Sequence, residues 1–143
     1  MNKVISYLVL ATLVMARTPQ YVSDQKKDIP VISELESDRA ELPIQYAPGL
    51  FLIDIRQEEW VLVFEYVYYY KAEELGDVNQ AKKFIERRII QELSAEYFKS
   101  TNGGKNDIYE HLNQGFKYRF IFRNDNEDWG FHLDVKQNDL IRE

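Results

Sequence analysis

The segment Trp60–Tyr70, with the sequence WVLVFEYVYYY, constrains the fold more than any other part of the chain. Tyrosine supplies four of its eleven residues, and only Glu65 is charged. Successive side chains of a β-strand point to opposite faces, and here both faces are largely apolar. That pattern is typical of a central strand, or of a strand whose second face is covered.

The two faces of this strand differ in kind. Six residues form the aromatic face: Trp60, Leu62, Phe64, Tyr66, Tyr68 and Tyr70. Five residues form the second face: Val61, Val63, Glu65, Val67 and Tyr69. Tyrosine can bury its ring and keep its hydroxyl at a wet edge, so we expect the aromatic face to pack against the longest helix. A lone charge between valines is costly, so Glu65 is expected to pair with Arg119 or Arg123 across the sheet, or to face a partner.

Two β-hairpins are predicted, one on each side of a long helical segment. Residues 50–56 and 60–70 are apolar runs joined by a short polar connection, which is typical of a hairpin. Residues 116–122 and 129–135 alternate between apolar and polar side chains on either side of the turn NDNED. Such alternation predicts antiparallel strands with one dry face and one wet face.

A long amphipathic helix is predicted at residues 78–99. Asp77 and Gln80 before it have the spacing of a capping box. Its apolar face is expected to comprise Ala81, Phe84, Ile85, Ile89, Leu93 and Tyr97. A shorter helix is expected to begin at Asp107 and to stop at Gly115.

These elements predict a two-layer α+β domain. Its sheet would have four antiparallel strands in the order hairpin, helix, hairpin, with the long helix across one face. A short N-terminal helix is expected at residues 30–42, with Pro30 in its first position. The length of 143 residues suits a single domain, which we expect to span residues 30–143.

The first sixteen residues, MNKVISYLVLATLVMA, have the layout of a secretory signal peptide. Lys3 supplies a positive start, an apolar run follows, and Val14 and Ala16 place small residues before a cut. The run would reach about 20 Å, which is short of a hydrocarbon core of about 30 Å. We therefore expect a signal peptide at residues 1–16, a flexible leader at 17–29, and a product in the periplasm or secreted. No membrane span is expected after signal removal.

The formal net charge of −6 limits the partners that the chain can take. Nucleic acid and anionic membrane surfaces are not expected, because no basic stripe is visible. A basic partner fits the acidic charge, since opposite fields speed encounter. The chain has no cysteine, which excludes disulfides, thiolate catalysis and cysteine-ligated zinc.

No strong catalytic motif is present, and neither a cofactor nor a metal site is predicted. His132 and Asp134 lie two residues apart on one wet strand face, which resembles half of a catalytic pair, although a solvated histidine explains the pattern better. The acidic turn Asn124–Asp128 lacks the glycine and the distal glutamate of a calcium loop. A hairpin turn therefore explains it better.

The order of features resembles that of small exported α+β proteins of unknown function from Gram-negative bacteria. The motifs behind the resemblance are Glu41-Leu42-Pro43, the tyrosine-rich segment 64–68, and Gly115, Tyr118 and Phe120 at the start of the last hairpin. The likeness spans residues 30–136. It implies an α+β fold and an exported location, and it implies no activity.

The second face of the tyrosine-rich strand leads to the main function hypothesis. Apolar patches rarely stay bare on a soluble monomer, so three covers are considered: the helix at 30–42, a second copy of the chain, or a partner or apolar ligand. A partner would contact Val61, Val63, Glu65, Val67 and Tyr69. The hypothesis is an exported, non-enzymatic binding protein, such as an inhibitor, immunity or assembly factor, with a protein partner or with itself.

Two alternative functions stay open. The first is a carrier of a small apolar ligand, held between helix and sheet by Tyr66, Tyr68, Phe120 and Trp129. The second is a small hydrolase or isomerase that uses His132 with Asp134.

Overall fold

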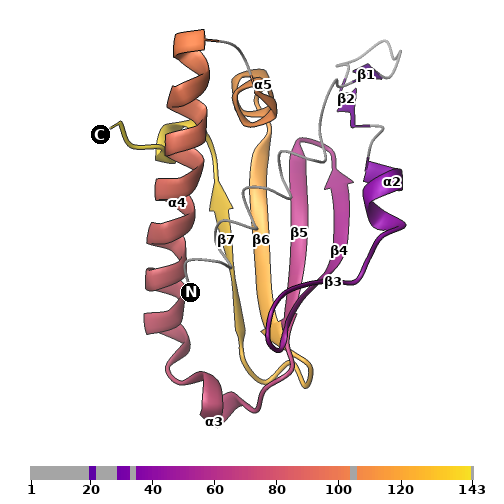
Figure 1. Cartoon of the computed structure of the whole chain (residues 1–143), viewed down its shortest axis with the longest axis vertical. Helices are drawn as coiled ribbons and strands as arrows, with labels where there is room; N and C mark the ends of the chain where they lie inside the picture. Colours follow the sequence, from indigo (N-terminus) through magenta and orange to yellow (C-terminus); the bar gives the residue numbers. More distant parts are fainter. Residues whose placement is uncertain (1–19, 22–28, 33–34, 104–105, 143) are drawn as a thin grey trace.

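The computed structural model describes residues 20–21, 29–32, 35–103 and 106–142. The predicted signal peptide lies outside these ranges, as does most of the predicted leader. The described chain forms a five-stranded sheet with a long helix, α4 (Val78–Gly103), running along it (Figure 1). The predicted α+β class with one long helix is confirmed.

The sheet has the strand order β3-β4-β5-β6-β7. The strands span Ile44–Ala47 (β3), Leu50–Glu58 (β4), Val61–Tyr68 (β5), Lys117–Asn124 (β6) and Gly130–Val135 (β7). The pairs β4–β5 and β6–β7 are antiparallel, so both predicted hairpins are confirmed. The prediction of four antiparallel strands is wrong in two respects, because β3 adds an edge strand and β5 runs parallel to β6.

The parallel pairing follows from the path of the chain between the two hairpins. Val61 pairs with Lys117 and Tyr68 pairs with Asn124, so the two strands match along their whole length. Parallel strands need a crossover connection. The 26 residues of α4 span about 39 Å, which is longer than an eight-residue strand of about 27 Å. The helix therefore returns the chain to the end of the sheet where β5 began.

The other helices are short. They span Leu35–Arg39 (α2), Ala72–Leu75 (α3) and Asp107–Gln114 (α5), and a 3₁₀ helix, η1, spans Gln137–Asp139. The Asp77 carboxylate accepts from the amides of Asn79 (2.8 Å) and Gln80 (3.2 Å), which confirms it as the cap of α4. Asn106 caps α5 where Asp107 was expected to do so, because its side chain accepts a first-turn amide.

The segment before the sheet differs from the helix predicted at residues 30–42. Pro30–Val31 forms a short strand, β2, which pairs with β1 (Gln20–Tyr21) inside the predicted leader. The side-chain amide of Gln57 in β4 bonds to the backbone on either side of Val31: its Nε2 donates to the Pro30 carbonyl, and its Oε1 accepts from the Ile32 N–H. These bonds hold the backbone extended, so the helix α2 begins later than its sequence predicts.

The core lies between α4 and the inner face of the sheet. The aromatic face of β5 meets aromatic residues of β6, since Phe64 stacks on Phe120 with ring centroids 5.4 Å apart and Tyr66 stacks on Phe122 at 5.0 Å. Helix α4 adds Ile85, Ile89, Leu93 and Tyr97, all buried. The prediction that the aromatic face of the strand packs against the longest helix is confirmed.

One residue of the predicted apolar helix face points elsewhere. Phe84 is 44% exposed, whereas Ile85 and Ile89 are buried. The buried apolar residues of α4 recur every four positions, and a neighbouring position is rotated by about 100° around the helix axis. Phe84 therefore leaves the core even though its spacing from later apolar residues fits a helical face.

Two buried tyrosines test what a hydroxyl contributes in this core. The Tyr66 hydroxyl has no hydrogen-bond partner among the described residues, whereas the Tyr118 hydroxyl lies 2.6 Å from His111 Nδ1. We expect Tyr66→Phe to leave the free energy of unfolding unchanged or to raise it by up to about 1 kcal/mol, and Tyr118→Phe to lower it by about 1–2 kcal/mol. Urea denaturation followed by circular dichroism measures both. A larger loss for Tyr66→Phe than for Tyr118→Phe contradicts this reading.

His111 should make the stability depend on pH. It is 1% exposed, it contacts the rings of Phe116 and Tyr118, and burial lowers its pKa to about 4. The pKa of His111 in the folded state lies below the unfolded value of about 6.5. The contribution of neutral His111 to the free energy of unfolding is therefore complete above about pH 6.5 and is lost as the pH falls towards 4. We expect the free energy of unfolding to fall by about 2 kcal/mol more in the parent than in His111→Gln between pH 7.5 and pH 5. Equal pH slopes in urea denaturation of the two proteins would refute this.

Candidate functional site: the outer face of the first hairpin

The outer face of the sheet, opposite the core, carries the second face of the tyrosine-rich strand. The strand register fixes the neighbours of each β5 side chain on it. Val63 lies between Arg56 of β4 and Arg119 of β6. Val67 likewise lies between Phe51 of β4 and Arg123 of β6.

The five predicted contact residues differ sharply in exposure. Val63 is 0% and Val67 2% exposed, Val61 and Glu65 are half-buried, and Tyr69, one residue beyond β5, is 55% exposed. Arginine can lay its alkyl stem over apolar surface while its head stays in water, and Val63 has an arginine on each side. Of the five residues, only Tyr69 therefore offers a large exposed hydrophobic side chain.

The N-terminal segment is one of the three predicted covers of this face. Ile32 and Leu35 are buried, and they belong to the core cluster that contains Phe64 and Tyr66. This segment thus packs into the main core.

Ion pairs run across the outer face from strand to strand. Arg56 Nη1 donates to Asp54 at 2.8 Å and to Glu65 at 3.1 Å, and Arg123 Nε donates to the other oxygen of Glu65 at 3.3 Å. Glu65 therefore receives an arginine from each neighbouring strand. Of its two expected partners, Arg123 is confirmed, whereas Arg119 pairs elsewhere.

Asp134 is held by cations from β6. Arg119 donates to both of its oxygens, at 2.7 and 2.9 Å, and Lys117 donates at 2.9 Å. These bonds, that of Arg119 first, hold the pKa of the Asp134 carboxyl well below its usual range. A carboxylate of such low pKa is a poor base, and no hydrogen bond within the described chain joins it to the exposed His132. The geometry gives no support to a catalytic pair.

The residues of the predicted apolar pocket do come together, but as packed rings. Tyr66 is 0% and Phe120 1% exposed, while the rings of Tyr68 and Trp129 meet edge to face at 5.8 Å. Trp129 Nε1 also donates to the Gly76 carbonyl at 3.0 Å. The side chains expected to line a ligand pocket thus pack against one another.

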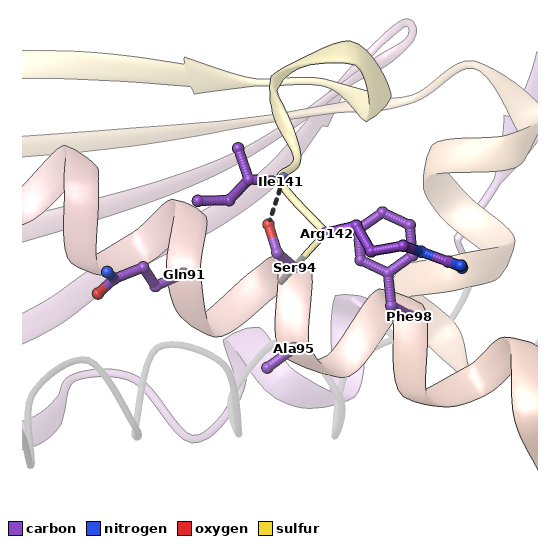
Figure 2. A pocket seen from close by; sticks show the side chains of 6 residues that line it. All are labelled: Gln91, Ser94, Ala95, Phe98, Ile141 and Arg142. Carbon is purple, nitrogen blue, oxygen red and sulfur yellow. Dashed lines mark hydrogen bonds between the residues drawn. The ribbon is translucent and has the colours of Figure 1, made fainter.

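A small hollow lies between α4 and the C-terminal residues. Figure 2 shows Ser94 and Phe98 of α4 facing the C-terminal residues Ile141 and Arg142, around a space of about 150 Å³. The Ile141 N–H donates to Ser94 Oγ at 3.0 Å, and the Arg142 guanidinium lies 4.7 Å from the centre of the Phe98 ring. Ligand pockets occupy about 300–1,000 Å³, so this hollow is small for a drug-sized molecule.

Sequence reasoning included Tyr69 in the site but missed the surface around it. The Phe51 ring meets the Tyr69 ring edge to face at 5.4 Å, and the Tyr69 N–H donates to the Gly49 carbonyl at 2.8 Å. Tyr70 is 36% exposed, and its hydroxyl donates to the Pro48 carbonyl at 3.0 Å. The sequence does contain a signal for this surface, which is the adjacent pair Tyr69 and Tyr70. Adjacent residues at a strand end point to opposite faces, so the two rings cannot both lie on the core face.

None of the helices in the described ranges combines the length and the apolar character that crossing a bilayer requires.

No protein-family model and no curated protein matches the sequence. Solved structures do share the fold. A Pseudomonas aeruginosa protein provisionally described as secreted superposes with a TM-score of 0.58 at 6% identity, over 75% of this chain and 86% of that one. The type II secretion pilotins EpsS of Vibrio vulnificus and AspS of Vibrio cholerae give TM-scores of 0.49 and 0.48 at 14% and 17% identity. They cover 78% and 75% of this chain and 88% and 85% of their own.

Identities this low report on the fold alone. At that level, the first of these structures agrees with the resemblance seen in the sequence, to small exported α+β proteins of Gram-negative bacteria.

The ion pairs of Glu65 should contribute measurably to stability. Its side chain is 21% exposed and is shared by Arg56 and Arg123, so Glu65→Gln should lower the free energy of unfolding by about 1 kcal/mol. Glu73→Gln, at an exposed position without an ion pair among the described residues, should change it by less than about 0.5 kcal/mol. Urea denaturation compares the free energies of unfolding of the two variants. Equal losses would show that the ion pairs of Glu65 do not stabilise the fold.

Proposed function

We propose that the protein is an exported, non-enzymatic binding protein of the periplasm or the exterior, of the inhibitor, immunity or assembly-factor kind. It contacts a protein partner through the outer face of its first hairpin. The observation that carries the proposal is the exposure of Tyr69. Its side chain lies at the end of that face, is 55% exposed and contacts the ring of Phe51.

Two further features support this function. The first sixteen residues have the layout of an export signal, and the fold is shared with the Pseudomonas aeruginosa protein described as secreted. Exposed tyrosine is also the kind of side chain that interfaces favour, since it is large, rigid and has a polar tip.

The buried valines change how the proposal is tested. An aspartate at Val63 or Val67 would enter a fully buried position and would report on folding instead of binding. Tyr69→Ala alters an exposed side chain, so we expect the fold to survive and partner capture to fall by about tenfold or more. Phe84→Ala is the matched control, because Phe84 is an exposed aromatic residue, at 44%, on the helix α4.

The measurement is quantitative capture from periplasmic extract, using the processed chain as bait and mass spectrometry as readout. Light scattering on the bait alone gives its oligomeric mass. Loss of the same captured protein with Tyr69→Ala but not with Phe84→Ala supports the proposal. Equal capture by all three baits, or capture that depends on Phe84, contradicts it; a bait that is dimeric and captures nothing points to self-association.

A further inference from the structure

Three connections meet at one end of the sheet. The turn between β3 and β4, the segment Tyr69–Asp77 with helix α3, and the turn Asp125–Asp128 between β6 and β7 all lie at the lower end in Figure 1. Backbone bonds tie them together, since Tyr69 N–H donates to the Gly49 carbonyl and Asp125 N–H to the Tyr68 carbonyl. The side chains of this end are therefore displayed on a fixed frame.

Aromatic rings stand exposed at this end. Tyr69 is 55% and Tyr70 36% exposed, and Phe51 supports Tyr69 from the neighbouring strand. The hydrogen bond from Tyr70 to Pro48 and the ring contact with Phe51 restrict both tyrosines. Rings that are already restricted lose little conformational entropy when a partner binds them.

This end of the sheet also carries carboxylates. The same segments carry Glu73, Glu74, Asp77, Asp125, Glu127 and Asp128, all exposed, against a single cation, Lys71. Asp77 caps α4, Asp128 bonds to Asn124, and Glu127 lies 3.7 Å from Arg123. Within the described chain, no ion pair or side-chain hydrogen bond engages the other three, Glu73, Glu74 and Asp125.

The carboxylates of the outer face are in a different environment. There, Asp54, Glu58, Glu65 and Asp134 all have an arginine or lysine within 4 Å, so the charges are satisfied inside the molecule. At the end of the sheet, the connections that carry the exposed aromatic rings and the turn after β6 hold three carboxylates without such a partner among the described residues. The surface formed by Phe51, Tyr69, Tyr70, Glu73, Glu74 and Asp125 is called the Tyr69 surface.

We propose that the Tyr69 surface binds an arginine- or lysine-rich segment of a protein partner. A guanidinium group can stack on an aromatic ring and donate to a carboxylate at the same time. An acidic surface also speeds encounter with a basic partner. This inference rests on the proposed function, and adds to it the chemistry of the partner and the extent of the contact.

A synthetic peptide that alternates arginine and glycine is the probe, with a lysine version and a glutamate version as comparisons. In about 50 mM NaCl, where charges are weakly screened, the arginine peptide should shift amide NMR signals of residues 69–77 and 125–128. The lysine peptide should shift the same signals less, because it lacks the planar group that stacks. The glutamate peptide should shift none of them.

A matched pair of triple variants separates a site from net charge. Glu73→Gln/Glu74→Gln/Asp125→Asn removes the three unengaged carboxylates, while Glu36→Gln/Glu41→Gln/Glu86→Gln removes three exposed ones elsewhere. Fluorescence anisotropy should show affinity for the arginine peptide weakened about tenfold in the first triple and less than about twofold in the second. Tyr69→Ala, which leaves the charge unchanged, should weaken it by about threefold or more.

Equal weakening by both triples would mean that only net charge attracts the peptide, which overturns the proposal. An unchanged affinity in Tyr69→Ala overturns it as well, because the rings would then play no part. The capture experiment is repeated with the first triple as bait. If capture needs Tyr69 but not these carboxylates, partner binding stands and the basic-segment inference fails; if nothing is captured, the proposed function fails while the peptide titration still decides the chemistry of the surface.

Discussion

The stacking of β5 against β6 is the contact on which the rest of the structure depends. The strands run parallel and in register, so Phe64 lies opposite Phe120 and Tyr66 opposite Phe122, with ring centroids 5.4 and 5.0 Å apart. This pairing joins two hairpins that are otherwise local structures, each closed by its own short turn. It also makes α4 necessary, because a parallel pair needs a connection that returns the chain to the starting end of the sheet. The helix then buries the same rings that the pairing has aligned.

The same register determines what the opposite face can be. Among the β5 valines that point away from the core, Val63 lies between Arg56 and Arg119 and Val67 lies beside Arg123. These arginines reach carboxylates on neighbouring strands. Glu65 sits between Val63 and Val67 and receives Arg56 from one side and Arg123 from the other. The valines of the outer face are therefore covered without a second layer of the fold and without a second subunit. Long charged side chains can shield the valines and neutralise one another.

Local patterns were sufficient for much of this fold. Both hairpins, the long helix with its Asp77 cap and the short helix before Gly115 were readable because each is fixed by residues close in sequence. The pairing of β5 with β6 joins residues 56 positions apart, as Val61 and Lys117 show, and alternation alone is the same for parallel and antiparallel strands. β3 is four residues long and follows Pro43 directly, which reads as a break. The burial of Val63 was not predictable either, because it depends on which strand supplies the neighbouring arginines.

The tyrosine-rich run therefore contains two kinds of residue with different uses. Tyr66 lies wholly inside, where its ring stabilises the core and its hydroxyl finds no partner in the described chain. Tyr69 follows the last paired residue of β5, Tyr68. The alternation of the strand directs its side chain to the outer face, and the ring is exposed because no paired strand residue follows it. The chain next turns into an acidic helix, α3, so the exposed ring and two of the three unengaged carboxylates, Glu73 and Glu74, arise from one short stretch of sequence. A core strand that ends in this way places a restricted aromatic side chain and a negative field at the same end of the sheet, which is the combination that a cationic segment of a partner would recognise.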